Sequence, residues 1–383
     1  MDDLDTRVLR AALAWQQAGT AAVLVTVART WGSSPRPPGS FMAIDAQGRV
    51  VGSVSGGCIE DDLIERIRSQ GITAVCAGGR PQVLRYGVSA EQAHRFGLPC
   101  GGTVELVLEP VGAHSRLDEL LAARQQRQAL CRELDLATGA VTLRPATAAD
   151  APGWDATTGL DPLPGAPDTR RLLTPFGPPY RLILIGAGDL SRFLCEMALG
   201  LGFELIVCDP REEQAQGWSF SGELPGVTLT REMPDDCVQR LRPDARTAVI
   251  ALTHDPKLDD LALMDALATP AFYVGAIGSR RNSAQRRERL REHFEVPEAA
   301  LARLRGPAGL YIGSQTPAEI ALSILAEVVA AKNGVSFSDQ AQVAAAKARR
   351  EAAAGADAAH AAWLAVAAVP ATCGLGAGLG SDR

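Results

Sequence analysis

The sequence predicts an α/β protein of two domains, of which the second holds a doubly wound, parallel sheet. Its 383 residues are about two to three times the length of a usual domain. In the second half, aliphatic strands alternate with amphipathic segments, as in parallel sheets covered by helices. The chain between the halves is dense in Pro, Gly, Ala and Thr. These observations predict domains at 1–112 and 180–335, an interdomain segment with the linker at 113–179, and an Ala/Gly-rich tail at 336–383.

Composition and charge exclude several classes of protein. With 46% hydrophobic and 21% charged residues, the chain can form two ordinary cores. The net charge of −6 argues against nucleic-acid binding. The sequence has no apolar run of about 18 residues, the length that would predict a membrane span. The eight cysteines form no CxxC pair, and the first residues lack the pattern of a secretion signal. We therefore expect a cytoplasmic protein with free thiols that binds neither nucleic acid nor membrane.

The predicted elements of the first half follow from local patterns. Strands are rich in β-branched and aliphatic residues, and the loop at 31–40 is stiff because it holds three prolines. We expect helices at 6–17 and 59–69, a strand at 22–27, a hairpin in FMAIDAQGRVVGSV, and paired strands at 81–86 and 103–109. The interdomain segment should hold a polar helix at 117–124 and a hairpin at 130–143.

The predicted strands of the second half are RLILIG, FELIVCD, TAVIAL and FYVGAIG. The first runs into a turn in which Gly186 and Gly188 open a helix, so backbone amides can approach a phosphate. Asp209 ends the next strand, where a carboxylate can bind ribose hydroxyls. This pattern predicts a Rossmann-like domain. Ser191 replaces the third glycine of the fingerprint, where it should hinder close helix–strand packing. Asp189 would repel an anion, so a turn that no longer binds a dinucleotide stays an alternative.

Two further segments, 253–255 and 275–281, follow later strands and can line the same crevice. Ser279 and Arg280 begin a segment with six arginines, and their place beside the crevice suits phosphate contacts. For most of the six arginines, a solvated helix face is the simpler interpretation.

Two thiols stand beside glycine pairs in the first half. Cys58 follows Gly56 and Gly57 at a helix start, where the helix dipole favours a thiolate and glycine amides can meet an anion. The carboxylates at 60–62 oppose this, so a packed structural cysteine stays open. Cys100 precedes Gly101 and Gly102, which allow a bulky ligand to approach. No histidine lies near either thiol, which excludes zinc-site and Cys/His-protease patterns; the other cysteines are predicted to lie in cores.

Six segments carry a resemblance to a known family. In order, they are VTVARTWGSSPRPPGSFMAIDAQGRVVGSVSGGCIEDDLI, RYGVSAEQAHRFGLPCGGTVELVLEP, LILIGAGDLSRFL, ALTHDPKLDDLAL, VGAIGSRRNSAQRRERL and IGSQTPAEIALSILAEVVAAKNG. Together they span roughly residues 20–335 and closely resemble the xanthine dehydrogenase accessory family, XdhC/CoxI. The chain departs from the family pattern at Ser191, where glycine is usual, and at Tyr311, where an acidic residue is usual.

The resemblance implies a family-specific N-terminal α/β domain, a C-terminal Rossmann-like domain, and a function that composition does not indicate. Family members bind molybdenum cofactor, assist its sulfuration with a cysteine desulfurase, shield it from oxidation, and insert it into xanthine dehydrogenase or a related molybdenum hydroxylase. Turnover of an organic substrate is not implied. We expect a homo-oligomer, because the segment 320–331 is an apolar helix.

The resemblance also selects candidate site residues. A pterin phosphate needs amides and arginines, and a molybdenum–sulfur centre suits a soft thiolate. We assign Cys100 and Cys58, with their glycines, to cofactor handling, and Cys100 is the candidate metal ligand. Arg36, Arg280 and Ser279 are candidates for phosphate contacts, and Gly186, Gly188 and Asp209 for a crevice that binds NAD(P) or another nucleotide.

Two other functions remain open at this stage. An NAD(P)-dependent oxidoreductase would use the same glycine turn, with His254 as proton donor, but leaves the GSSPRPPG, GGC and CGG motifs unexplained. A cofactor-free scaffold would dock the immature client enzyme and bind no pterin.

Overall fold

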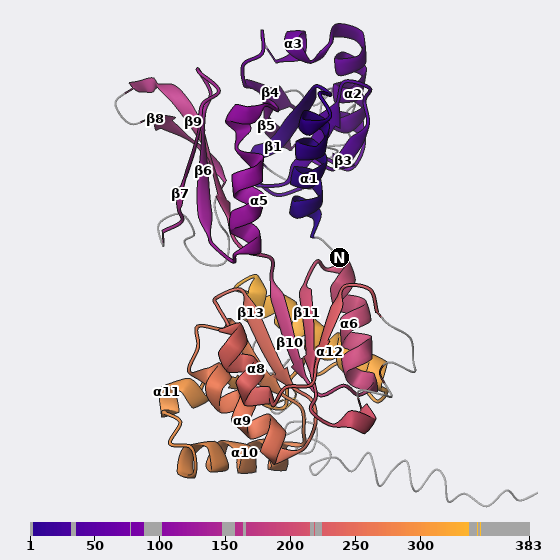
Figure 1. Ribbon diagram of the computed structural model, residues 1–383, viewed down its shortest axis with the longest axis vertical. Helices are drawn as coiled ribbons and strands as arrows, with labels where there is room; N and C mark the ends of the chain where they lie inside the picture. The colour runs from indigo at the N-terminus through magenta and orange to yellow at the C-terminus, as the bar shows by residue number, and fades with distance from the viewer. Residues whose placement is uncertain are drawn as a thin grey trace, which may run out of the picture.

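The computed structural model describes residues 3–31, 36–76, 78–87, 102–147, 158–163, 166–214, 218, 224–336, 343 and 345. The chain forms two lobes, with the N-terminal residues in the upper lobe of Figure 1 and the parallel sheet in the lower one. The predicted class, α/β with a C-terminal doubly wound parallel sheet, is confirmed. None of the described helices has the length and hydropathy needed to cross a membrane.

The N-terminal lobe is built on a five-stranded sheet with the order β3-β2-β1-β5-β4. Its elements are α1 (Leu4–Gln17), β1 (Ala22–Trp31), β2 (Phe41–Asp45), β3 (Val50–Gly52), α2 (Cys58–Gln70), α3 (Ile72–Val75), β4 (Gln82–Tyr86) and β5 (Thr103–Pro110). All neighbouring strands are antiparallel. The expected hairpin and strand pair are therefore confirmed.

The side chains of β1 alternate between the two faces of the sheet, and both faces are buried. Val23 and Val25 pack with Ile59 and Leu63 of α2 on one face. On the other face, Leu24 packs with residues of α1. This double burial explains why the strand reads as a continuous aliphatic run. It also fixes the beginning of α2, which carries the GGC motif, against the sheet.

The interdomain segment contains more structure than we expected of a linker. It forms η1 (Ala113–Ser115), α5 (Leu117–Gln125), β6 (Leu130–Asp135), β7 (Val141–Pro145), β8 (Gly159–Leu163) and β9 (Ala166–Phe176), with a four-stranded antiparallel sheet in the order β7-β6-β9-β8. This sheet joins the N-terminal lobe: Phe176 stacks on Phe41, with ring centroids 5.2 Å apart. The Pro- and Thr-rich composition concealed β8 and β9.

The C-terminal lobe is a six-stranded parallel sheet with the order β12-β11-β10-β13-β14-β15. Its elements are β10 (Arg181–Ile185), α6 (Asp189–Gly200), β11 (Glu204–Cys208), β12 (Val227–Thr230), α8 (Pro234–Leu241), β13 (Thr247–Ala251), α9 (Pro256–Leu267), β14 (Tyr273–Ala276), α10 (Arg280–Glu292), α11 (Glu298–Leu301), β15 (Leu304–Arg305) and α12 (Pro317–Lys332). The four predicted strands are confirmed. The strand order reverses between β10 and β13, and ligands of such sheets bind at this switch point.

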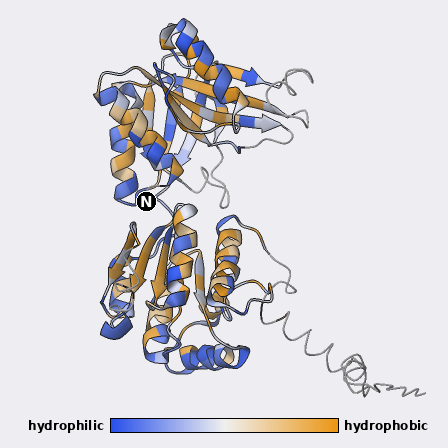
Figure 2. Ribbon diagram, turned by 90° about the vertical axis from the view of Figure 1, so that its right-hand side faces the viewer, coloured by the Kyte–Doolittle hydropathy of each residue, from blue (hydrophilic) through white to orange (hydrophobic). Residues whose placement is uncertain are grey.

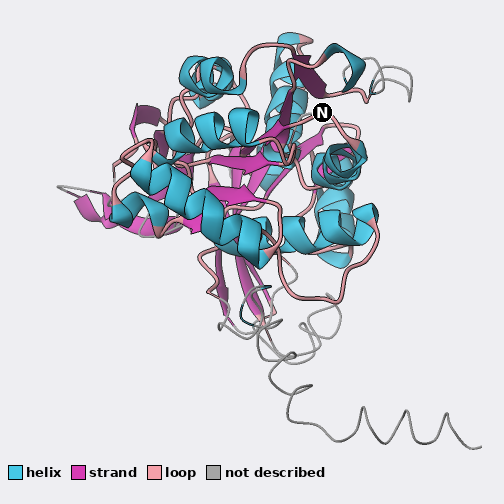
Figure 3. Cartoon of the chain, turned by 90° about the horizontal axis from the view of Figure 1, so that it is seen from below, coloured by secondary structure: helices cyan, strands magenta, loops and turns pink. Residues whose placement is uncertain are grey.

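Helices cover both faces of the parallel sheet, as the view from below shows (Figure 3). α6 and α12 pack on the face that carries Leu182 and Leu184, and α8, α9 and α10 pack on the face of Ile183 and Ile185. Figure 2 shows hydrophobic residues concentrated on the strands inside these layers. The cores therefore leave only the sheet edges and loops for ligands.

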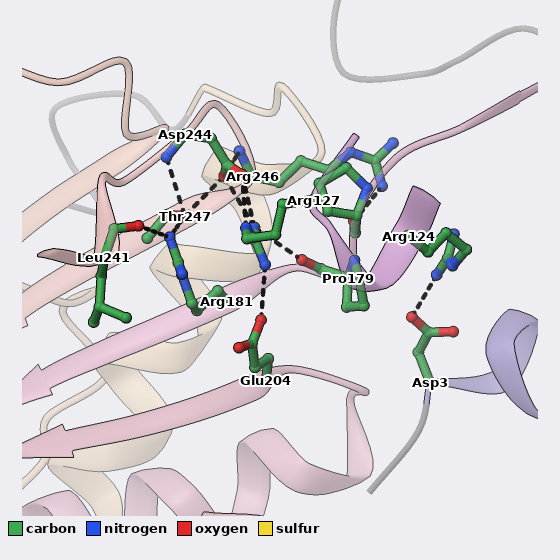
Figure 4. A network of polar contacts seen from close by, with 11 residues as sticks. Asp3, Arg124, Arg127, Pro179, Arg181, Glu204, Leu241, Asp244, Arg246 and Thr247 are labelled. Carbon is green, nitrogen blue, oxygen red and sulfur yellow. Dashed lines mark hydrogen bonds and ion pairs between the residues drawn. The ribbon is translucent and has the colours of Figure 1, made fainter. Parts of the chain in front are cut away.

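Arg127 forms ion pairs that join the two lobes (Figure 4). Arg127, just after α5, contacts Glu204 at 2.7 Å and Asp244 at 2.9 Å, and donates to the Pro179 carbonyl at 3.3 Å. Both carboxylates belong to the C-terminal lobe, beside the amino end of β10. The carboxyl ends of the parallel strands, and the nucleotide crevice, therefore face away from the N-terminal lobe.

Candidate functional site

The GGC motif forms the turn from β3 into α2 and presents an exposed thiol. Gly56 and Gly57 have φ values of 100° and 149°, which side chains other than glycine rarely adopt. Cys58 is the first residue of α2, and its side chain is exposed. The interpretation of Cys58 as a packed structural cysteine is therefore wrong. The buried state expected for the other cysteines is confirmed for those described, namely Cys76, Cys131, Cys195, Cys208 and Cys237.

A buried carboxylate, Glu60, occupies the inside of this turn. Its oxygens accept hydrogen bonds from the amides of Val54 (2.9 Å), Ser55 (2.8 Å), Gly56 (3.1 Å) and Gly57 (2.9 Å), and from the hydroxyls of Ser53 (2.8 Å) and Ser55. Burial alone would raise the pKa of Glu60, but the hydrogen bonds from Ser55 and Ser53 lower it well below its usual range. The glycine amides that we expected to meet an external anion thus already bind an internal one.

The first turns of α2, which follow the GGC motif, contact β4 beside the beginning of β5. Asp62 is one helical turn after Cys58, so the two share a face of α2. The Tyr86 hydroxyl donates to Asp62 at 2.7 Å, and Tyr86 pairs with Val104 of β5. Gly102 is buried and directly precedes β5, two residues before Val104. Cys100 and Gly101 lie outside the described residues.

At this site, the described side chains offer a metal ion single ligands and no group of three. In the described part of the chain, no three His, Cys, Asp or Glu side chains are grouped so that they could hold a metal ion. As far as the described residues are concerned, a metal that binds Cys58 therefore has to bring further ligands of its own. A pterin-bound molybdenum meets this condition, because the pterin supplies sulfur ligands of its own and a thiolate is a soft additional donor.

The Rossmann turn has the expected backbone and an unexpected use of its serine. Gly186 has φ of 113°, and a Cβ there would lie 2.9 Å from Thr253 Cγ2, so glycine is required. Gly188 caps α6 in open space. We expected Ser191 to hinder helix–strand packing. Instead, its buried hydroxyl donates to the Gly186 carbonyl at 2.5 Å and ties the helix to the turn.

Asp209 lies beside this turn, as predicted, but its carboxylate has partners within the chain. It accepts hydrogen bonds from the Ala187 amide at 2.8 Å and from the Arg211 guanidinium at 2.8 and 2.9 Å. Burial alone would raise the pKa of Asp209, and the contacts with Arg211 and Ala187 lower it. A ribose could bind Asp209 only by replacing Arg211.

A cavity of about 300 Å³ lies at the crevice and is lined by Leu190, His254, Ile277 and Ser279, among others. The Ser279 hydroxyl caps α10 by accepting from the Asn282 amide at 3.1 Å, and Arg280 begins that helix. Arg36 belongs to the loop before β2 in the other lobe. The predicted site residues thus form two groups: Cys58, Gly56, Gly57, Gly102 and Arg36 in the N-terminal lobe, and Gly186, Gly188, Asp209, Ser279 and Arg280 in the C-terminal one.

Not every arginine of α10 lies on the solvated face that we expected. Arg286 is buried and contacts Asp259 at 2.8 Å and Asp260 at 3.1 Å. Arg289 also binds Asp260, at 2.6 Å. The helix is thereby fastened to α9, and the interpretation is wrong for Arg286. The acidic pair that follows the HDPK sequence was the signal that could have indicated this.

Sequence reasoning also missed Glu60 as the centre of the GGC turn. Glu60 is the third residue of α2, the position from which a glutamate reaches back to the amide of the N-cap residue. This spacing could have identified it. Arg211, two residues after Asp209, carried no comparable signal.

Comparisons with known proteins cover both lobes. Residues 15–87 match the model of the XdhC and CoxI family, and residues 182–328 match that of the XdhC Rossmann domain. The molybdenum cofactor insertion chaperone PaoD of Escherichia coli K12 is 27% identical over 85% of this chain and 88% of its own length. A probable xanthine dehydrogenase subunit of Bacillus subtilis 168 is 25% identical over 82% and 94%.

One solved structure has the same fold over most of its length. It is a xanthine dehydrogenase structure from Bacillus halodurans, with a TM-score of 0.65 and 22% identity, covering 87% of this chain and 96% of its own. At that identity, the likeness concerns the fold alone. The two family models match the two lobes in the order that the sequence predicts. The chain therefore belongs to the XdhC and CoxI family.

Proposed function

We propose that this protein is a molybdenum cofactor-binding chaperone, which inserts the cofactor into a xanthine dehydrogenase-type molybdenum hydroxylase. The observation that carries the proposal is the likeness along 85% of the chain to PaoD, which is named as a molybdenum cofactor insertion chaperone. Within the same proposal, the protein shields the cofactor, assists its sulfuration together with a cysteine desulfurase, and turns over no substrate of its own. We place this activity in the cytoplasm.

The exposed thiol of Cys58 supports a direct role in holding this cargo. A thiolate is a soft donor that suits molybdenum, and the start of α2 places it on a rigid turn. Glu60 takes up the amides of that turn, so the recognition at this point falls to the thiol. Cys100 with Gly101, next to Gly102, is the second part of the proposed site.

The oxidoreductase alternative has less support. Its cofactor would need the Asp209 carboxylate for the ribose, and Arg211 and the Ala187 amide already bind that group. Nucleotide binding in the crevice is not needed for the chaperone proposal.

The test is anaerobic incubation of the purified full chain with molybdenum cofactor, followed by gel filtration and measurement of co-eluting molybdenum and pterin. Wild type should retain the cofactor stoichiometrically, and Cys58→Ala and Cys100→Ala should lose most of it. Cys195→Ala is the matched control, because it removes a buried thiol in the other lobe. The same elution volumes report the predicted self-association.

The outcomes separate the candidate functions. Retention by wild type and loss in either thiol variant supports a thiol-dependent chaperone. Failure of wild type to retain intact cofactor, with binding of a cofactor-free client enzyme, would favour the scaffold. Reduction or oxidation of NAD(P) in a substrate screen would favour the oxidoreductase.

A further inference from the structure

A polar cavity of about 320 Å³ lies where the two lobes meet. The N-terminal lobe contributes the loop with Pro37 and Gly39, which belongs to the GSSPRPPGS motif, and Arg124 of α5. The C-terminal lobe contributes Arg246 and Lys332. The proposed function leaves this part of the motif without a role. The cavity is also separate from the nucleotide crevice, which opens at the opposite edge of the parallel sheet.

The charges that line this cavity are unbalanced. Three cations, Arg124, Arg246 and Lys332, line it with one carboxyl group, Asp5. A second carboxylate, Asp3, pairs with Arg124 at 2.7 Å from outside the lining, so the cations still outnumber the carboxylates. Burial raises the pKa of Asp5. The cavity thus has a net positive charge, which an anionic ligand would compensate.

Arg246 has no acidic partner in the described part of the chain. Its guanidinium donates to the Pro178 carbonyl at 3.2 Å and lies 4.8 Å from the centre of the Tyr180 ring. Burial lowers the pKa of Arg246, although the nearby carboxylates of Asp244 and Asp5 oppose this shift. A half-buried arginine with these contacts retains donors for a ligand.

Arg124 adds a donor that lacks an acceptor. Its side chain is 6% exposed, and two of its nitrogens bind the Gly177 carbonyl at 2.8 Å and Asp3 at 2.7 Å. Its buried Nε–H has no hydrogen-bond partner among the described residues. Arg124 and Arg246 come from the two lobes and both belong to the network in Figure 4. This unsatisfied donor leaves the guanidinium of Arg124 incompletely paired in the cavity wall.

Gly177 makes room for the Arg246 guanidinium. A Cβ at Gly177 would lie 2.3 Å from Arg246 Cζ, so any side chain there would push the guanidinium aside. Because the obstructing atoms are the end of a flexible side chain, this movement need not unfold the protein. Gly177 therefore offers a way to displace the charge without removing it.

We propose that this interdomain cavity binds the phosphoryl group of a small organic ligand, with Arg246, Arg124 and Lys332 as its cationic contacts. A phosphate monoester carries up to two negative charges and several acceptor oxygens, which suits this set of donors. The volume leaves room for part of an attached organic group. The source is either the phosphate of a carried pterin or that of a free nucleotide. If the ligand is the carried pterin, the site rests on the proposed function and deepens it; if the ligand is a free nucleotide, the site goes beyond that function.

The experiment is titration of the full chain with inorganic pyrophosphate by calorimetry at low ionic strength. Wild type should bind it, and Arg246→Gln should bind roughly tenfold or more weakly, as expected when a hydrogen bond between charged groups is lost. Gly177→Ala should also weaken binding while keeping every charge. Arg291→Gln is the control, because Arg291 pairs with Glu298 on the surface, away from the cavity. The affinity of this variant for pyrophosphate should equal that of wild type.

The results distinguish the ligand sources and can overturn the site. Displacement of pyrophosphate by molybdenum cofactor identifies the pterin phosphate as the ligand, and displacement by AMP alone identifies a nucleotide. Absence of pyrophosphate binding to wild type, or equal affinity in folded Arg246→Gln and Gly177→Ala, would overturn the proposal. Cofactor co-elution measures the proposed function separately, so failure of one does not imply failure of the other.

Discussion

Two turns of this molecule carry a pair of glycines at the start of a helix, and each holds a carboxylate of its own chain. In the GGC turn, Glu60 accepts hydrogen bonds from four backbone amides and two hydroxyls. In the Rossmann turn, Asp209 accepts one amide of the turn, that of Ala187, and pairs with Arg211. The same device, an internal anion at a helix start, is thus used in two ways.

The difference concerns what each turn can offer a ligand. The GGC turn is closed by hydrogen bonds alone, with no cation paired to Glu60 among the described residues, so it offers the Cys58 thiol and not its amides. The Rossmann turn is closed by Arg211, whose side chain is 35% exposed and can move away. We therefore expect a rigid first turn and an adjustable second one.

The largest expected effect is that of Glu60→Ala. This change leaves several buried donors without an acceptor and should lower the free energy of unfolding of the N-terminal lobe by about 3–5 kcal/mol. Denaturant unfolding, followed by spectroscopy, measures it. Glu65→Gln, on the exposed side of the same helix, should stay within about 0.5 kcal/mol of wild type. A loss below about 1 kcal/mol for Glu60→Ala would contradict a turn organised by this carboxylate.

Acid should affect the first turn in a defined direction. The pKa of Glu60 in the folded protein lies below its ordinary value of 4.5, so its ionised form stabilises the folded state at neutral pH. This contribution should decline as the pH falls below 4.5 towards the lowered pKa. The difference in unfolding free energy between wild type and Glu60→Gln, measured from pH 7 to 3, should therefore shrink. A difference that stays constant or grows would argue against a lowered pKa.

The second turn should respond more weakly to loss of its cation. Arg211→Ala removes a partly exposed partner of Asp209, and we expect about 1 kcal/mol of destabilisation after allowance for solvent screening. Thermal unfolding of the C-terminal lobe reports it. If Arg211→Ala destabilises as much as Glu60→Ala, the two turns are equally rigid and the proposed contrast fails.

The smallest effect should come from Ser191→Ala. It removes the hydrogen bond to the Gly186 carbonyl and should cost about 1 kcal/mol or less. Thermal unfolding against wild type is the measurement. An increase in stability would instead mean that the hydroxyl hinders helix–strand packing, as the sequence first indicated.

Much of the fold could be predicted because burial leaves a direct trace in the sequence. The strands of the parallel sheet are aliphatic runs, and the turn at Gly186 follows one of them. β8 and β9 were missed, since their prolines and threonines resemble a linker, and β9 joins the sheet by pairing with the distant β6 as well as with the neighbouring β8. A short antiparallel sheet of this kind is determined by tertiary contacts more than by composition.

The candidate site was predictable only in part. The motifs selected Cys58 and Asp209, but Glu60, which binds the turn before Cys58, and Arg211, the partner of Asp209, were identified from contacts in the structure. The cluster of interdomain cations could not be predicted from the sequence, because Arg124 and Arg246 are far apart along the chain. They come to line one cavity only through the packing of the lobes. Charges that gather from distant elements leave no local pattern.

The central claim, delivery of the cofactor to a client, is tested most directly by a transfer experiment. The anaerobically loaded chain is mixed with a cofactor-free xanthine dehydrogenase-type enzyme, in the presence of a second protein that captures free cofactor, and hydroxylase activity is followed. We predict that the loaded chain activates the enzyme despite the capturing protein, whereas free cofactor does not. Equal sensitivity of both to the capturing protein would show that the cofactor passes through solution, which would contradict the chaperone role.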